Sequence, residues 1–176
     1  MPARKRQRGS DELLSAVKEF LGDIKAVRKA LASKDVDVNA RDSGHPGDTV
    51  LMIAVAQTNP ACVKLLIDKG ADVNARNSDG YTALMSAVYH ELDLRVAKLL
   101  LERGADVNAR TNEGLTALHS AASYCNECAA KMLLERGADV NARNNQGYTA
   151  LMLSKCEKLT KLLLDNGADV NARNNE

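Results

Sequence analysis

The chain has 176 residues, a formal net charge of +1 and an aromatic content of only 3%. This balanced charge argues against a protein whose main partner is nucleic acid or an anionic membrane, and no apolar stretch approaches the roughly 20 residues of a membrane-spanning helix. The apolar fraction of 45% suffices for a folded core. With so few aromatic residues, that core must consist of Leu, Val, Ala and Met, which suits closely packed helix pairs.

The first nine residues are rich in basic side chains, and we expect residues 1–9 to form a disordered tail. Within it, Lys5, Arg6 and Arg8 resemble a short nuclear-import signal, although a solvated tail without that role fits equally well. No apolar run follows the basic start, so we see no secretory signal. We therefore expect an intracellular protein, cytoplasmic with the nucleus as an alternative, whose four cysteines are reduced thiols.

Residues 10–41 are predicted to form a capping unit of two helices. Ser10 is a candidate N-cap for a helix over about residues 11–21, because its hydroxyl can accept a hydrogen bond from a free backbone N–H. The second helix is predicted to end at about Ser33. A unit of this kind covers the apolar end of a repeated stack.

From there the sequence repeats itself. The heptapeptide Gly-Ala-Asp-Val-Asn-Ala-Arg occurs four times at spacings of 34, 33 and 30 residues, and a weaker copy precedes the first. The weaker copy and the first three full copies are each followed by a Thr that can cap a helix and by two short apolar stretches. Helices of two turns are unstable alone, so each pair must bury its apolar side on its neighbours. The predicted repeats span 42–76, 77–110, 111–143 and a shorter one at 144–176.

These motifs resemble the ankyrin repeat, most closely at Thr116–His119 and at 137–142, and the resemblance covers roughly residues 10–176. It implies an all-α ankyrin-repeat solenoid of about five repeats including caps, with helix-turn-helix pairs and β-hairpin-like loops. The sequence departs from the family pattern in two ways. Ala or Val replaces the usual Pro after the Thr, and the usual His is kept only at His119. Met occupies the equivalent position in the other repeats, which removes a Thr–His hydrogen-bond network: Met52, Met85 and Met152.

The resemblance implies a non-catalytic module that binds a partner protein through the concave groove of its first helices and through its hairpin tips. We expect a monomer with no cofactor, no small-molecule substrate and no membrane partner, and nucleic-acid binding is not expected. Two alternatives remain open. One is a nuclear regulatory adaptor or inhibitor that uses the basic tail for import, and the other is a pathogen or viral effector that binds host proteins.

All four tyrosines fall at positions that should face this groove. Tyr offers a rigid, amphipathic contact surface and is over-represented in binding hot spots. The competing interpretation is that these rings pack on the neighbouring repeat. The predicted partner-binding residues are Tyr81, Tyr89, His90, Leu115, Ser123, Tyr124, Tyr148 and Gln57.

Cys125 and Cys128 have the spacing of half a zinc site, which Cys156 and His119 could complete. Because no second pair with this spacing exists, we favour structural thiols, with Cys128 on the buried side of its helix, and expect no metal site. No Ser or Cys nucleophile is placed beside a His with an orienting acid, so no catalytic site is predicted. His119 is interpreted as a hydrogen-bonding residue at a helix start.

Asn108 and Asn141 each have a Leu eight positions earlier. This pattern resembles the sites that 2-oxoglutarate-dependent asparaginyl hydroxylases modify in ankyrin repeats, so both are candidate hydroxylation sites. The alternative is that Asn and Leu are simply part of the repeat consensus, kept for packing.

Overall fold

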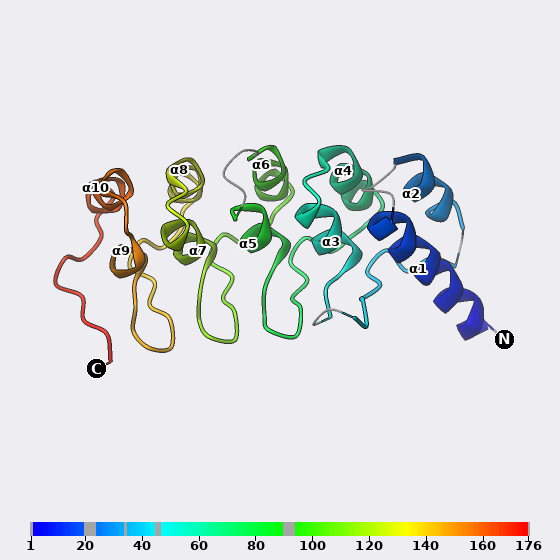
Figure 1. The fold of residues 1–176 in the computed structure, drawn as a ribbon, viewed down its shortest axis with the longest axis horizontal. Coiled ribbons are helices and arrows are strands. Elements are labelled where there is room, and N and C mark those ends of the chain that lie inside the picture. Colours follow the sequence, from blue (N-terminus) through cyan, green and yellow to red (C-terminus); the bar gives the residue numbers. More distant parts are fainter. Residues whose placement is uncertain (1, 20–23, 34, 45–46, 90–93, 176) are drawn as a thin grey trace.

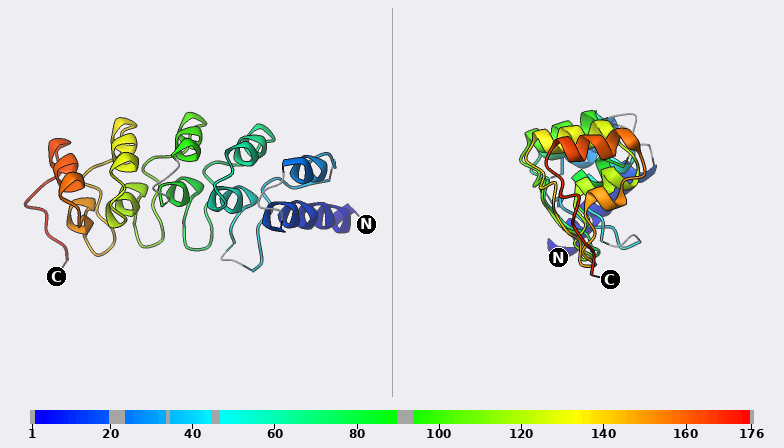
Figure 2. Two further views of the ribbon diagram at one scale, coloured as in Figure 1. Left: turned by 45° about the horizontal axis from the view of Figure 1, so that its top comes forward. Right: turned by 90° about the vertical axis from the view of Figure 1, so that its left-hand side faces the viewer.

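Five pairs of short helices are stacked side by side in the computed structural model, which describes residues 2–19, 24–33, 35–44, 47–89 and 94–175. The odd-numbered helices form one row and the even-numbered helices a second, and the connecting loops extend from one edge (Figure 1). Figure 2 shows the pairs one behind another in register. This is the solenoid that the sequence predicts. The helices are α1 (Pro2–Glu19), α2 (Ile24–Ala30), α3 (Val50–Ala56), α4 (Pro60–Asp68), α5 (Ala83–Ala87), α6 (Arg95–Glu102), α7 (Ala117–Ser123), α8 (Glu127–Glu135), α9 (Ala150–Leu153) and α10 (Glu157–Asp165).

Threonine precedes the first helix of each repeat after the N-terminal unit, as predicted. The Thr49 hydroxyl accepts the backbone N–H of Met52 at 3.3 Å, and Thr82 and Thr149 make the corresponding bond in their repeats. These bonds satisfy backbone donors that a helix start leaves without a partner. The second helices of the four later pairs end before glycines of positive φ, such as Gly104 at 85°, which is the usual way to stop a helix.

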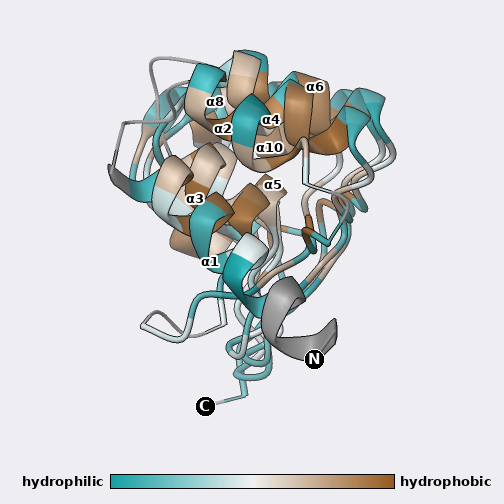
Figure 3. Ribbon diagram, turned by 90° about the vertical axis from the view of Figure 1, so that its right-hand side faces the viewer, coloured by the Kyte–Doolittle hydropathy of each residue, from teal (hydrophilic) through white to brown (hydrophobic). Residues whose placement is uncertain are grey.

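The core lies between the two rows of helices and continues along the whole stack. Figure 3 shows the hydrophobic residues turned toward the space between the rows, while the loops are mostly hydrophilic. Each first helix also packs on the first helix of the next repeat, so the buried surface is shared between repeats. The Leu in the middle of each of the four later second helices is fully buried: Leu66, Leu100, Leu133 and Leu163.

The N-terminal unit corrects two expectations. Of the tail predicted at residues 1–9, the structure describes residues 2–9, and these are helical, because α1 begins at Pro2 and continues unbroken to Glu19. Arg and Gln favour helix, and Arg8 pairs with Glu12 one turn later at 3.5 Å. Ser10 therefore lies inside the helix and does not cap it, and its hydroxyl instead accepts the backbone N–H of Asp37 at 3.3 Å.

The loops are joined to one another by a repeated set of side-chain hydrogen bonds, and we call this side of the molecule the loop edge (residues 35–49, 70–82, 104–116, 137–149 and 167–175). The side-chain oxygen of Asn108 accepts the backbone N–H of Asp139 at 2.9 Å, and its NH₂ group donates to the carbonyl of Gly137 at 3.1 Å. The Asp side chains bond within their own loops, as Asp106 does with the N–H of Asn108. Asn residues one repeat apart make the same bond to the next Asp: Asn39, Asn74 and Asn141.

Arginine side chains add a second series of bonds along the loop edge. Arg41 donates to the carbonyl of Arg76 at 2.7 Å, and Arg143 donates to that of Arg173 at 2.8 Å. Within the described residues, β pairing in the loops is limited to an isolated antiparallel bridge between Arg41 and Thr49. Backbone bonds also join successive loops, as the N–H of Asn112 donates to the carbonyl of Asp79 at 2.9 Å. The loops therefore owe their regular spacing to side-chain and backbone hydrogen bonds and not to a sheet.

Candidate functional site

Three of the four tyrosines surround one hollow on the row of first helices. We call this hollow, of about 260 Å³, the tyrosine groove, and it extends over α3, α5 and α7. Tyr81 lies just before α5, Tyr89 just after it and Tyr124 at the end of α7. Their exposed fractions are 38%, 52% and 46%, which is high for large apolar rings. The complete lining is Ala56, Tyr81, Met85, Ser86, Tyr89, Ser120 and Tyr124.

Tyr89 and Tyr124 come from neighbouring repeats and form a ring pair. Their ring centroids are 4.2 Å apart and the ring planes are tilted by 55°, an arrangement that stabilises aromatic pairs. The side-chain hydrogen bond with Tyr89 raises the pKa of Tyr124 above its ordinary value of 10.0. The Tyr124 hydroxyl therefore stays protonated at neutral pH, and the two rings hold each other in place.

Four lining residues were missed by the sequence prediction of the site. Met85 and Ser86 belong to α5 (Ala83–Ala87), and Tyr81 and Tyr89 lie just outside its two ends. Ser120 precedes Tyr124, the C-cap of α7, by four residues. This spacing of four was the available signal, because residues that far apart on a helix are neighbours in space.

A second hollow of about 320 Å³ adjoins the tyrosine groove through Ala56. Ile53 and Gln57 line it from α3 and its end, together with Lys18 and Asp48. The Gln57 side-chain oxygen Oε1 is buried there and, within the described part of the chain, accepts no hydrogen bond. A buried acceptor of this kind is costly unless a donor reaches it.

The other predicted groove residues have different surroundings. Ser123 is exposed on α7, whereas Leu115 and Tyr148 are half-buried before the helices of their repeats. None of these three lines the tyrosine groove. His90 lies outside the described residues, so its place in the groove stays a prediction.

His119 is buried at the start of α7 and is fully used in hydrogen bonding. Its Nδ1 accepts the backbone N–H of Thr116 at 3.1 Å, and its Nε2 donates to the carbonyl of Tyr148 at 3.0 Å. Desolvation by burial lowers the pKa of His119 below its ordinary value of 6.5. Counting the N-terminal unit as repeat one, so that repeats two to five begin at residues 42, 77, 111 and 144, Met52 stands at the equivalent position of repeat two. Its sulfur accepts the N–H of Thr49 at 3.5 Å instead. The interpretation of His119 as a helix-start residue agrees with these contacts.

The expectation of four reduced thiols is wrong for two of them. Cys125 and Cys156 form a disulfide. Their Cα atoms are 5.8 Å apart, a separation that this bond can span. Cys128 is exposed and not on the buried side, since α8 turns Ala129 and Leu133 inward. Burial raises the pKa of the remaining thiol, Cys62, to about 11.

The zinc alternative receives no support from the geometry. Among the described residues, no group of three or more His, Cys, Asp and Glu side chains is placed to hold a metal ion. Two of the cysteines that would have completed the site, Cys125 and Cys156, are bonded to each other. A disulfide sulfur is not the thiolate that zinc binds.

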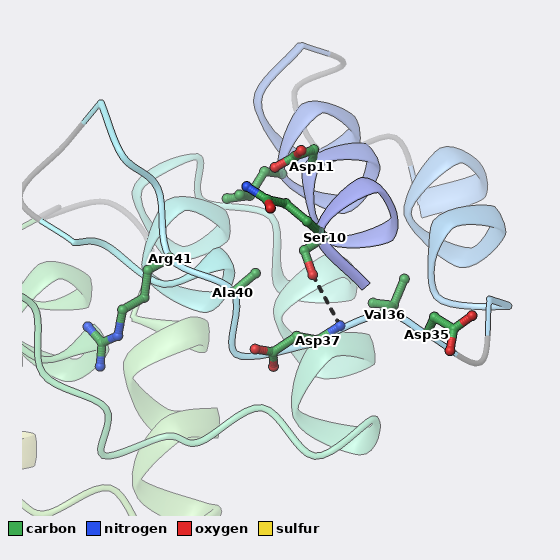
Figure 4. A pocket seen from close by; sticks show the side chains of 9 residues that line it. Ser10, Asp11, Asp35, Val36, Asp37, Ala40 and Arg41 are labelled. Atoms are coloured by element: carbon green, nitrogen blue, oxygen red, sulfur yellow. Dashed lines mark hydrogen bonds between the residues drawn. The ribbon is translucent and has the colours of Figure 1, made fainter. Parts of the chain in front are cut away.

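A larger hollow of about 600 Å³ lies at the N-terminal end, between α1 and the first loop. Asp11, Asp35 and Asp37 line it, but their carboxylates lie on different sides of it (Figure 4). The bond from the backbone of Asp37 to the Ser10 hydroxyl, drawn in Figure 4, holds the loop against the helix. The acidic groups therefore do not converge on a common point.

A model of ankyrin repeats that holds three copies matches this chain over residues 13–111 and 94–174. The chain belongs to the ankyrin-repeat family. Ankyrin repeats are generally protein–protein interaction modules and are typically not catalytic. Within the residues that the structure describes, none of the ankyrin helices has the length and apolar character needed to cross a bilayer.

Curated relatives share this repeat and little else of their length. An ankyrin repeat protein of Acanthamoeba polyphaga mimivirus is 42% identical over 62 residues, which are 34% of this chain and 38% of that protein. M-phase phosphoprotein 8 of Rattus norvegicus is 41% identical over 78 residues, 44% of this chain and 9% of the relative. Ankyrin repeat and SAM domain-containing protein 6 of Rattus norvegicus is 47% identical over 53 residues, 30% of this chain and 6% of the relative. The chain thus covers well under half of each relative.

Asn108 and Asn141 are exposed residues of the ankyrin loop edge. Their side-chain amides bond to the next loop, and the Leu residues eight positions earlier, Leu100 and Leu133, are fully buried. Packing and hydrogen bonding thus give both residue types a structural reason to recur. Hydroxylation of the two asparagines stays a prediction.

Proposed function

We propose that this ankyrin stack holds a partner protein by receiving an apolar side chain of that partner in the tyrosine groove. What supports the proposal is that Tyr81, Tyr89 and Tyr124, from two different repeats, surround a single hollow. The chain has only four tyrosines and no Trp. Exposed aromatic rings gathered in one place are characteristic of the anchors that dominate binding energy.

The lining of the groove indicates the chemistry of the partner segment. The tyrosine groove has no charged side chain among its lining residues and combines apolar surface with the hydroxyls of Tyr and Ser. Such a surface suits an apolar anchor flanked by groups that can hydrogen-bond at the rim. Charge steering contributes little here, so complementarity of shape sets the affinity.

The adjoining hollow extends the proposed contact toward the N-terminal end. A segment that continues past Ala56 would bring a hydrogen-bond donor to the unpartnered Oε1 of Gln57. Satisfying this buried acceptor would favour the bound state. The partner in this proposal therefore presents an apolar anchor followed by a donor such as a backbone N–H.

Binding of this kind needs no change in the stack. The ring pair of Tyr89 and Tyr124 is already in contact before a partner arrives, so few side chains lose freedom on docking. In this proposal the protein acts as a preformed, non-catalytic holder that works as a monomer inside the cell. Import through Lys5, Arg6 and Arg8, and the nuclear and viral roles, stay predictions.

The test compares two double variants. Tyr89→Ala with Tyr124→Ala removes the anchors, and the control, Lys98→Ala with Lys131→Ala, changes two exposed side chains on the even-numbered row. Proteins captured from the native cell are measured by quantitative mass spectrometry, and Kd is then measured for each protein that the control retains. We expect a loss of affinity of about thirtyfold or more in the tyrosine variant alone. Equal affinity in both variants, with both folded by circular dichroism, would refute the proposal.

A further inference from the structure

The disulfide between Cys125 and Cys156 joins the inter-helix turns of two neighbouring repeats. Cys125 follows Tyr124, the C-cap of α7, and precedes Asn126, the N-cap of α8. Cys156 is itself the N-cap of α10. Their sequence separation is 31 residues, close to the spacing of the repeat. Both residues are half-buried, so small molecules in solution can reach them.

The turn that contains Cys125 does not need the disulfide. Thr58 stands at the equivalent place in repeat two and has φ of 52°, against 57° for Cys125. In both turns the next residue is an Asn whose side chain caps the second helix, Asn59 and Asn126. Thr58 adopts this conformation without a cross-link, so the disulfide is not needed to hold the turn at Cys125. The disulfide therefore acts on the turn at Cys156, in repeat five.

Among the described residues, the side-chain hydrogen bonds in the turn of repeat five stay within that repeat, as that between Ser154 and Thr160 does, whereas the turn of repeat four also bonds to its neighbour. There, Asn126 donates to the carbonyl of Val88 in repeat three at 3.0 Å and so ties its turn to the preceding repeat. At the N-cap of α10, Cys156 makes no side-chain cap bond. The disulfide thus occupies the place of the hydrogen bond by which Asn126 holds repeat four to its neighbour.

The first helix of repeat five is also weakly packed. The helix α9 has four residues, of which only Ala150 is buried, whereas α7 has seven residues and buries five of them. Units with few buried contacts open at low free-energy cost. A covalent link to Cys125 therefore matters more here than it would in a well-packed repeat.

We propose that Cys125 and Cys156 are a reversible thiol–disulfide exchange site for small thiols of the glutathione class, and that the bond holds repeat five on repeat four. A thiolate RS⁻ attacks one cysteine sulfur, the protein S–S bond breaks, and the other cysteine leaves as a thiolate. A second RS⁻ attacks the mixed disulfide and releases RSSR and the remaining cysteine thiolate. The two cysteine thiolates then take up protons. Two RSH thus supply both electrons and both protons, and the protein gains two thiols.

Reduction of the disulfide would also affect a hydrogen bond of the buried residue His119. The carbonyl of Tyr148 in repeat five accepts the Nε2 proton of His119 in repeat four. When repeat five moves away, His119 loses this partner. The lining of the tyrosine groove, in contrast, lies in repeats two to four, so the two proposals fail independently of one another.

Hydrogen–deuterium exchange of the full chain, read by mass spectrometry, tests the inference without any variant. The protein is measured after equilibration with oxidised glutathione and again with excess reduced glutathione, and intact mass reports the number of free thiols. Reduction should speed amide exchange in α9 and α10 by about tenfold or more and leave α3 and α4 unchanged. Equal exchange of α9 and α10 in the two states, or four free thiols under oxidising conditions, would overturn it.

Matched variants identify the cysteines responsible. Cys156→Ser should show fast exchange of α9 and α10 under both conditions. Cys128→Ser removes a thiol that lies three residues from Cys125 and is exposed, and this variant should respond to reduction as the unmodified protein does. If Cys128→Ser abolished the response instead, the exchange site would not be the pair proposed.

Discussion

The loop edge and the tyrosine groove lie on the same stack but differ in how their residues recur. Along the loop edge, the backbone N–H of Asp139 donates a hydrogen bond to the side-chain oxygen of Asn108. The same bond occurs in the loops before and after it, and all four have distances of 2.8 to 2.9 Å. In the groove, Tyr89 and Tyr124 pair in one place only among the described residues. The recurring residues therefore make the bonds that join one loop to the next, whereas the pair of Tyr89 and Tyr124 occurs where neighbouring repeats differ.

The strongest way to break the loop edge is to add a methyl group where loops touch. Gly80 has φ of +82°, and a Cβ there would lie 2.7 Å from the backbone nitrogen of Asn112. Gly104 has nearly the same φ of +85° with nothing within 4 Å. Gly80→Ala should cost about 3 kcal/mol and Gly104→Ala about 1 kcal/mol of unfolding free energy, the smaller value being the cost of the backbone conformation alone. Urea unfolding measures both, and equal losses would show that the loops can move apart.

A second experiment sharpens the comparison by removing one link of the loop edge. Asn108→Ala deletes the bonds to Asp139 and Gly137 and should cost about 2 kcal/mol, since it leaves both backbone groups without these partners. Asn171 stands at the equivalent position of repeat five, where the structure shows no side-chain bond to a further loop among the described residues. Asn171→Ala should therefore change stability by less than about 0.5 kcal/mol. Similar losses in the two variants would contradict the role assigned to the inter-loop bonds.

The smallest effect on stability is expected at His119, which stands at a position where the other repeats have Met. Burial lowers its pKa in the folded state, so the unfolded chain binds the proton more readily. The contribution to stability is complete above pH 6.5, declines as the pH falls through that value and levels off below the lowered native pKa. His119→Met should remove this decline, measured by urea unfolding at pH 7.5 and pH 5. An unchanged pH dependence in the variant would assign it to other groups.

The repeat architecture could be predicted from the sequence because its signals are local and occur several times. Thr49, Thr82 and Thr149 cap helices as expected, and the described residues form five helix pairs, in keeping with the expected solenoid of about five repeats. A capping residue, a short apolar helix and a terminating Gly each act within a few residues of chain. Four or five copies of the same pattern leave little room for another fold.

The remaining features depend on contacts between distant residues. Ser10 looks like a helix cap, yet it lies within α1 because its hydroxyl bonds to Asp37 in the following loop. The pairing of Cys125 with Cys156 depends on the stacking of two turns, and the local Cys125–Cys128 spacing pointed to a different partner. Met85 lines the groove because α5, a helix of only five residues, places it between Tyr81 and Tyr89, which lie outside the two ends of that helix.

The bonds of the loop edge have a consequence for how such a chain can change in length. Arg41 reaches the carbonyl of Arg76, and Arg143 that of Arg173, so every link connects one loop with the loop that follows it. A whole unit copied or removed between two such links leaves donor and acceptor still matched on either side. Gene duplication within the array can therefore lengthen the molecule one unit at a time, while the single pair of Tyr89 and Tyr124 keeps the proposed binding face in one place on the growing rod.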